Sequence, residues 1–183
     1  MACLLKPSAC DGQQLFDLKG LRMWRWVLLL CGAMSWPLHA EVYFGVLTHV
    51  SDGDTIWVAP EDGMAAKKLR LLGLDAPEIC QTGGVASRDA LQQALTGKRL
   101  RVSVNFQDQY GRGLARVSAE GQDVGALMVL SGQAWSSRWH GRLTTYAKEE
   151  KQARAAHLGV FAGPTAEWPG DFRKRYGSCY PAK

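Results

Sequence analysis

One stretch, residues 50–78, constrains the fold of this chain more than any other. It contains two strand-like runs separated by a polar turn. Asp52 and Asp54 lie at the start of the first run, and Asp75 and Glu78 follow the second. Carboxylates at the ends of neighbouring strands can converge on one hard cation, which takes oxygen ligands. The stretch therefore predicts two adjacent strands that carry a group of acids.

Two arginines accompany these acids. Arg70 lies within the second strand-like run, and Arg112 lies in a separate motif at residues 108–115 that also contains Tyr110. A planar guanidinium group matches the geometry of phosphate. Each fragment alone also has a simpler interpretation, because Asp-Gly-Asp is a common turn and most arginines are surface residues. The joint pattern of acids and arginines favours a phosphate-binding site.

Patterns of apolar residues outline the rest of the chain, and at 183 residues it can bury one ordinary core. Alternation and turn signals predict five strands, at residues 42–51, 54–58, 67–72, 99–106 and 114–119. Helical spacing predicts three helices, at residues 85–95, 124–130 and 144–157. The expected fold class is α+β, a small five-stranded antiparallel barrel with about three helices.

Taken in order, the three motifs resemble the staphylococcal nuclease (thermonuclease) family over about residues 42–161. The resemblance implies an OB-fold barrel. It also implies a calcium-dependent nuclease that hydrolyses phosphodiester bonds of DNA and RNA, as an endonuclease of the thermonuclease type. The alternative is a non-catalytic OB-fold module that binds nucleic acid, because some relatives keep the barrel and lose the acids. The formal net charge of +5 fits a polyanionic ligand without requiring one.

The resemblance implies a calcium site built from oxygen ligands. It assigns Asp54 and Asp75 as the carboxylate ligands and adds the backbone carbonyl of Ala76. Asp52 corresponds to an acid beside the metal that does not bind it directly. The expected cofactor is therefore Ca²⁺.

The same resemblance assigns the residues that act on the substrate. Glu78 matches the glutamate that serves as general base or orients the attacking water. Arg70 and Arg112 match the pair that clamps the phosphate and its transition state. Tyr110 lies at a position that contacts a substrate phosphate or base.

The base-binding region departs from the family pattern. Arg138 and His140 stand where the family's best-known member has two tyrosines. Trp135 or Trp139 could stack on a base in their place, although tryptophans in such positions are more often core residues.

Residues 1–40 are predicted to be an N-terminal leader. A short apolar run follows two arginines, and Ala40 is a small residue at which cleavage would fall. The signal peptide would cover residues 23–40, with Met23 as the true start. The run is shorter than the ~20 apolar residues that a spanning helix needs, so we expect no stable membrane span after cleavage. The predicted location is periplasmic or secreted.

Cleavage of the leader would leave Cys80 and Cys179. Two cysteines in an exported chain favour one disulfide, and two separate thiols are the alternative. We expect a nuclease domain at residues 41–163 and a basic, ordered or semi-ordered tail at residues 164–183. The protein is expected to act as a monomer.

Overall fold

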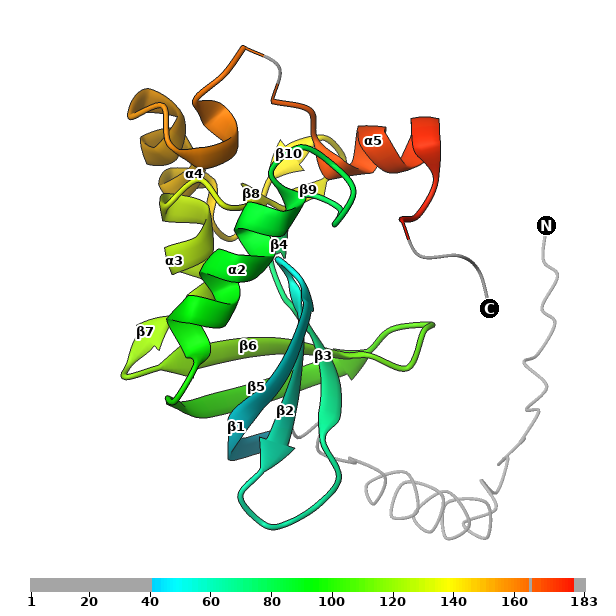
Figure 1. The fold of residues 1–183 in the computed structure, drawn as a ribbon, viewed down its shortest axis with the longest axis vertical. Coiled ribbons are helices and arrows are strands. Elements are labelled where there is room, and N and C mark those ends of the chain that lie inside the picture. Colours follow the sequence, from blue (N-terminus) through cyan, green and yellow to red (C-terminus); the bar gives the residue numbers. More distant parts are fainter. Residues whose placement is uncertain (1–40, 165, 180–183) are drawn as a thin grey trace, which may run out of the picture. The chain divides into compact units, whose positions relative to one another are not determined.

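The computed structural model describes residues 41–164 and 166–179 (Figure 1). These residues belong to one compact unit, residues 39–183. The predicted leader, with its signal peptide at residues 23–40 and the start at Met23, lies outside the described residues. Within the described part of the chain, the helices are all too short or too polar to cross a bilayer.

A closed sheet forms the body of this unit, with strand order β3-β2-β1-β5-β6-β7. Neighbouring strands run antiparallel, and a parallel pairing of β3 with β6 closes the barrel. The prediction of a five-stranded OB-fold barrel in an α+β chain is confirmed. The five barrel strands are β1 (Glu41–Asp52), β2 (Thr55–Pro60), β3 (Lys67–Leu71), β5 (Arg99–Gln107) and β6 (Gly113–Ala119). The two-residue strand β7 (Gln122–Asp123) pairs with β6 and extends the sheet.

Alternation along the strands decides which side chains enter the barrel. Leu69 and Leu71 of β3 are buried in the core. Because successive side chains of a strand point to opposite faces, Arg70 lies on the other face of β3. The core also takes alternating residues from the other strands, among them Ile56, Val58, Leu100, Val102, Ala115 and Val117.

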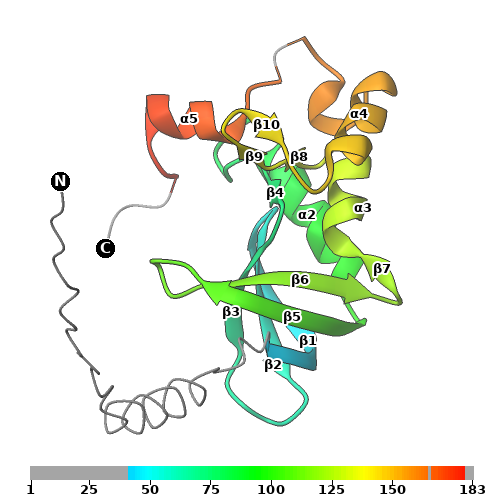
Figure 2. The ribbon, with the colours of Figure 1, turned by 180° about the vertical axis from the view of Figure 1, so that it is seen from behind.

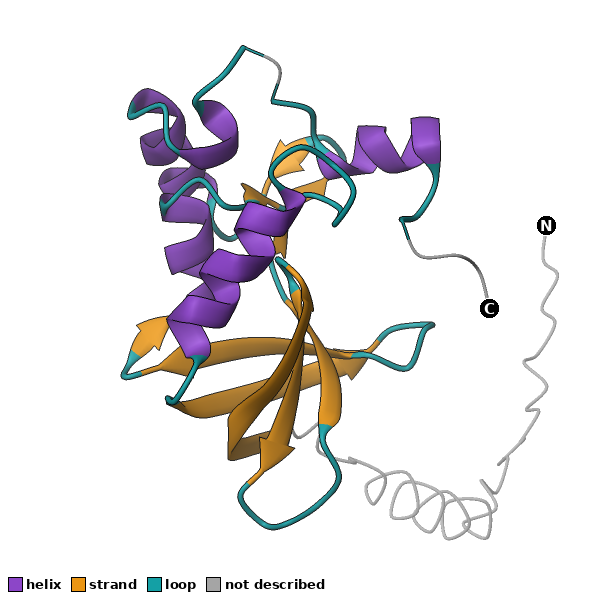
Figure 3. Ribbon diagram, in the orientation of Figure 1, coloured by secondary structure: helices purple, strands orange, loops and turns teal. Residues whose placement is uncertain are grey.

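Helices cover one end of the barrel (Figures 2 and 3). The three predicted helices are present, as α2 (Gly84–Leu95), α3 (Val124–Leu130) and α4 (Ala147–Ala155), and a short 3₁₀ helix, η2 (Gly159–Phe161), follows α4. Helix α4 begins three residues later than predicted, because Thr144 is engaged elsewhere. Its backbone N–H and its hydroxyl both donate to the Ser137 carbonyl, at 3.0 and 2.9 Å.

Four two-residue strands lie above the barrel in Figure 1, and the sequence pattern did not predict them. Strand β4 (Leu74–Asp75) pairs with β8 (Trp135–Ser136), and β9 (Arg138–Trp139) pairs with β10 (Arg142–Leu143). Two residues are too few to show the period-2 alternation that marks a strand.

The tail forms a helix, α5 (Pro169–Tyr176), which the sequence analysis described only as ordered or semi-ordered. Pro169 at its first turn suits a helix start, and Gly177 ends it with a φ of 76°. Beyond α5, Cys179 forms a disulfide with Cys80, with a Cα–Cα distance of 5.7 Å. The tail is thereby tied to the loop that follows Glu78.

Candidate active site

Asp54, Arg70 and Asp75 form a strand cluster. Asp54 immediately precedes β2, Arg70 lies in β3 opposite Thr55 of β2, and Asp75 ends β4. Arg70 Nη1 is 2.6 Å from Asp54 Oδ1, and Arg70 Nη2 donates to Asp75 Oδ1. The structure therefore brings two of the predicted metal ligands and one of the predicted arginines into direct contact.

Further hydrogen bonds fix the Asp54 carboxylate. Its Oδ1 accepts from the Thr55 hydroxyl at 3.0 Å, and its Oδ2 accepts from the Ala76 backbone N–H at 3.1 Å. The Asp54 N–H in turn donates to Asp52 Oδ1 at 3.0 Å. Asp54 thus links the β1–β2 turn to the segment that follows β4, where the Ala76 carbonyl belongs.

The turn before Asp54 requires glycine. A Cβ at Gly53 would overlap the Ser87 side chain of α2 and stand 2.7 Å from Ala76 Cβ. Any larger residue would push the turn away from α2 and from the segment after β4. The Asp-Gly-Asp motif is therefore both a turn and the means by which Asp54 reaches its partners.

Burial and like charge dominate the electrostatics of the strand cluster. Burial, with the nearby negative charge of Asp54, raises the pKa of Asp52 to about 7. Burial also raises the pKa of Asp75, although Arg70 and Arg173 oppose the shift. Asp54 and then Asp75 raise the pKa of Arg70 despite its burial. The three aspartates Asp52, Asp54 and Asp75 outnumber the two arginines beside them, Arg70 and Arg173, so the cluster favours additional positive charge.

Glu78 lies in the loop between β4 and α2 and is paired with the tail. Arg173 Nη1 of α5 is 2.7 Å from Glu78 Oε1, and its Nη2 is 3.6 Å from Asp75 Oδ1. The site therefore contains one chain of alternating charges, in the order Asp54, Arg70, Asp75, Arg173 and Glu78.

Arg173 was not predicted as a site residue. It lies in a basic run with Lys174 and Arg175, which the sequence marks only as part of a basic tail. One signal could have found it, because Cys80 is two residues beyond Glu78 and the expected disulfide brings Cys179 to the same loop.

Arg112 and Tyr110 lie in the β5–β6 loop. Arg112 Nε donates to Asp108 Oδ2 at 2.7 Å, and its guanidinium lies 5.4 Å from the centre of the Tyr110 ring. Arg112 directly precedes β6. Strands β3 and β6 pair in parallel, and Arg70 of β3 lies opposite Leu114 of β6. Among the described residues, however, the recorded side-chain contacts of Arg112 stay within its own loop. Tyr110 is 73% exposed and open to a ligand.

The region expected to bind a base is rearranged. Trp135 is 1% exposed and packs edge-to-face against Phe161 at 5.5 Å, so it is a core residue and presents no face to a base. The guanidinium of Arg138 lies 5.1 Å from the centre of the Trp168 ring. The side chain of Trp139 lies outside what the structure describes.

The donor chemistry of the strand cluster suits a hard cation. Asp54 and Asp75 offer carboxylate oxygens that already converge on one positive group, Arg70, and Ala76 offers a nearby backbone carbonyl. Oxygen-only ligand sets favour Ca²⁺ over Zn²⁺. Over the described residues, no three acid, histidine or cysteine side chains gather in a metal-binding arrangement. Asp54, Asp75 and the Ala76 carbonyl are the groups that could hold a hard cation in this cluster.

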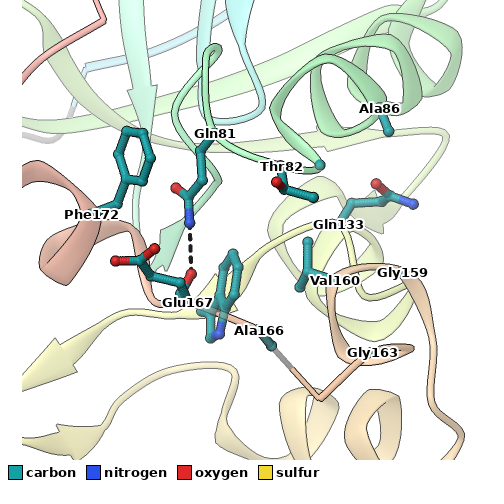
Figure 4. Close-up of a pocket in the computed structure, with 12 residues that line it drawn as sticks. Gln81, Thr82, Ala86, Gln133, Gly159, Val160, Gly163, Ala166, Glu167 and Phe172 are labelled. Atoms are coloured by element: carbon teal, nitrogen blue, oxygen red, sulfur yellow. Dashed lines mark hydrogen bonds between the residues drawn. The ribbon is translucent and has the colours of Figure 1, made fainter. Parts of the chain in front are cut away.

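A cavity of about 360 Å³ lies behind the loop that carries Glu78 (Figure 4). Gln81, Trp135, Glu167 and Phe172 line it, and Phe172 belongs to α5. Gln81 bridges two sides of this space. Its Nε2 donates to the Glu167 carbonyl at 2.7 Å, and its Oε1 accepts from the Glu78 N–H at 3.1 Å.

The fold and the site define an OB-fold barrel whose strand ends carry buried acids and phosphate-matching arginines. A family model described as "Staphylococcal nuclease homologue" matches residues 68–162, and the chain belongs to that family.

Relatives match most of the chain. A protein of Escherichia coli O157:H7 named "Uncharacterized endonuclease" is 32% identical over 155 residues, which cover 83% of this chain and 100% of the relative. The "Micrococcal nuclease" of Shigella flexneri is 32% identical over 152 residues, 77% of this chain and 86% of the relative. The "Probable staphylococcal-like nuclease CAN1" of Oryza sativa subsp. japonica is 34% identical over 122 residues, 65% of this chain and 37% of the relative.

Proposed function

We propose that this protein is a calcium-dependent endonuclease of the thermonuclease type, which hydrolyses phosphodiester bonds of DNA and RNA. Membership of the staphylococcal nuclease family and the names of its relatives support a nuclease. The observation that carries the proposal is the chain of alternating charges that joins Asp54, Arg70 and Asp75 to Glu78. A degenerate binding module would be expected to have lost one of these groups.

Calcium would be held by Asp54, Asp75 and the Ala76 carbonyl, with Asp52 supporting Asp54 through its backbone. When bound, the ion would supply positive charge that stabilises the negative charge developing on the phosphate. The excess of aspartates over arginines described above is the physical reason for binding it.

The side chains divide the remaining chemistry between them. A guanidinium has five N–H donors, and the two aspartates account for two donors of Arg70, so others remain for a phosphate oxygen. Arg112 uses Nε for Asp108 and keeps its terminal amino groups for the same purpose. Glu78 would orient the attacking water or accept its proton. The water oxygen would bond to phosphorus as the bond from phosphorus to the 5′-oxygen breaks, and the 5′-oxygen would leave as a hydroxyl after taking a proton from solvent.

We also propose that the protein is exported, to the periplasm or out of the cell, and acts as a monomer. The leader pattern at residues 1–40 supports export. The Cys80–Cys179 disulfide supports an oxidising compartment, because disulfides rarely persist in a reducing one.

Cleavage of single-stranded DNA, with calcium or with a chelator, tests the proposal. Glu78→Gln and Arg112→Ala are each expected to lower the calcium-dependent rate by about 10²–10⁴-fold. The matched controls are Glu120→Gln and Arg116→Ala, whose side chains are exposed and pair with Lys98 and Asp123. Both controls should cut within about twofold of the wild type.

Each alternative function gives a different result in this assay. Binding of DNA without calcium-dependent cutting would support the non-catalytic OB-fold module. Neither binding nor cutting would contradict both functions. Cutting that persists in the chelator would contradict the role assigned to calcium.

A further inference from the structure

We propose that Arg173 is a positioning residue that holds the Glu78 carboxylate in place, which makes the disulfide-tethered helix α5 a working part of the active site. The inference rests on the proposed function, because it assigns a partner to the residue that would act on water. It extends the site beyond the barrel, to a segment outside the family match at residues 68–162.

The contact itself is specific. Arg173 Nη1 lies 2.7 Å from Glu78 Oε1, while Nη2 of the same guanidinium lies 3.6 Å from Asp75 Oδ1. The Glu78 side chain is 16% exposed and that of Arg173 37%. In the described part of the chain, the carboxylate of Glu78 has no other recorded hydrogen-bond or ion-pair partner. A planar fork that engages two carboxylates fixes their relative placement better than a point charge does.

Electrostatics explain why Glu78 needs such a partner. Asp52, Asp54 and Asp75 all lie in the strand cluster or beside it, and Arg70 is the cation in direct contact with it from the barrel. Like charge would push the Glu78 carboxylate away from Asp75 and towards solvent. Arg173 lies between these two acids and offsets the repulsion.

Helix α5 is held by ties at its ends. Beyond its C-terminus, Cys179 is bonded to Cys80. Before its N-terminus, the Glu167 carbonyl accepts from Gln81, and the Glu167 carboxylate pairs with Arg175 of the helix. These contacts lie before and after Arg173 in the sequence, so they fix the position of the helix and of the Arg173 guanidinium.

Packing contributes less to the position of the helix. The cavity of about 360 Å³ lies under Phe172, so this side of α5 covers a hollow instead of a filled core (Figure 4). Trp168 packs against a small cluster with Trp135, Phe161 and Ala153, but no residue of α5 joins the main core. Within α5, Pro169 and Gly170 at the first turn are buried, and residues 171–176, which include Arg173, are half-buried or exposed. Loss of the disulfide beyond this exposed end should release Arg173 from Glu78.

Steady-state cleavage of single-stranded DNA by three variants of the full chain tests the contact. Arg173→Ala is expected to lower kcat by about 10- to 100-fold with KM changed less than about threefold, because it acts through Glu78. Arg173→Lys should recover part of the loss. The matched control is Lys174→Ala, which removes the same charge from the next residue of α5, where Lys174 pairs with Asp171. It should stay within about twofold of the wild type.

Removal of the disulfide tests the tether. Cys80→Ser with Cys179→Ser should lower kcat to a similar extent, and adding Arg173→Ala to this double variant should have little further effect. The binding of a short DNA strand in the presence of chelator should be equal for Arg173→Ala and Lys174→Ala. A merely structural role would instead lower the unfolding temperature of Arg173→Ala well below that of the control.

Three results would overturn the inference. In the first, the kcat of Arg173→Ala equals that of Lys174→Ala. In the second, Arg173→Ala cuts faster than the wild type, as expected if Arg173 blocks the site. In the third, the loss of kcat caused by Arg173→Ala adds fully to the loss caused by removing the disulfide. These results differ from failure of the proposed function, in which the wild type itself does not cut.

Discussion

The strand cluster (Asp54, Arg70, Asp75) and the outer residues (Glu78, Arg112, Arg173) are built on different principles. The acids of the strand cluster are buried. The register of β2 against β3 places Arg70 beside Asp54, and Asp75 lies in β4, which belongs to a separate two-stranded sheet. The outer residues lie on two loops and a tail helix, and the Glu78 side chain is 16% exposed, against 5% for Asp54 and 10% for Asp75. The difference teaches that strands place the inner charges of this site, whereas loops and a distant helix place the outer ones.

Removal of Arg70 should have the largest effect on the free energy of unfolding, because Arg70 pairs with both buried acids of the strand cluster. Arg70→Ala leaves Asp54 and Asp75 buried without their partner, which is expected to cost about 3–5 kcal/mol in free energy of unfolding without calcium. Lys68→Ala, on the exposed face of the same strand, should cost less than about 1 kcal/mol. Urea unfolding measures both. Equal losses would mean that the strand cluster is no more sensitive than the surface.

Loss of the disulfide should give the next largest effect. Cys80→Ser with Cys179→Ser opens a closure between residues 99 apart in sequence and is expected to cost about 2–4 kcal/mol. Hydrogen exchange of the folded protein should show faster exchange in α5 and unchanged exchange in β2 and β3. If hydrogen exchange in β2 and β3 became faster by as much as in α5, the strand cluster and the outer residues would not be independent.

Calcium should act through the strand cluster. At a concentration of about 100 times its Kd, it is expected to add about 2.7 kcal/mol to the free energy of unfolding. Asp75→Asn should lose this gain, while Arg112→Ala should keep it, because Arg112 contacts only its own loop among the described residues. Thermal unfolding with and without calcium tests both variants. A gain that survives in Asp75→Asn would remove Asp75 from the calcium site.

Asp108 in the β5–β6 loop should give the smallest effect and a distinct pH dependence. Burial acts to raise the pKa of Asp108, but hydrogen bonds from the Arg112 backbone and side chain and the Tyr110 N–H lower it overall. A carboxyl group with a lowered pKa stabilises folding above its unfolded pKa of about 4, and this is lost as the pH falls through the folded pKa. Asp108→Asn keeps a side-chain oxygen that can accept from the Tyr110 and Arg112 backbone N–H groups, but it loses the ion pair with Arg112.

The expected loss for Asp108→Asn at pH 7 is about 0.5–1 kcal/mol, as for other pairs near the surface. Urea unfolding of the variant and the wild type over a pH series measures it. The two free energies should converge below about pH 4. A difference that grows as the pH falls would contradict the assigned direction of the shift.

The contrast between the two groups also explains how much the sequence could predict. Alternation revealed the strands that hold Asp54 and Arg70, since the period of two is a local property. The parallel closure of β3 on β6 was not predicted, since the expectation was an antiparallel barrel and no local pattern shows which distant strands meet. The contacts of Asp54 with Ala76 depend on Gly53 lying against α2, which no periodicity reports.

Arg173 illustrates the opposite limit. Its role depends on the position of a helix that lies outside the main core and is tied to the rest of the chain by a covalent bond between distant residues. Local patterns in a basic run give no indication of the carboxylate that it meets. For Trp135 the sequence left two interpretations open, base stacking and a core position, and its packing against Phe161 shows that the core position is correct.

The separation between Cys80 and Cys179 has a consequence for the order of synthesis. A ribosome completes the whole barrel before it reaches α5, so a growing chain can fold its strands while Glu78 still lacks its partner Arg173. Oxidation then completes the assembly. We therefore expect the newly made polypeptide to have low nuclease activity in the reducing interior of the cell. This would protect the genome of the producing organism until the disulfide forms.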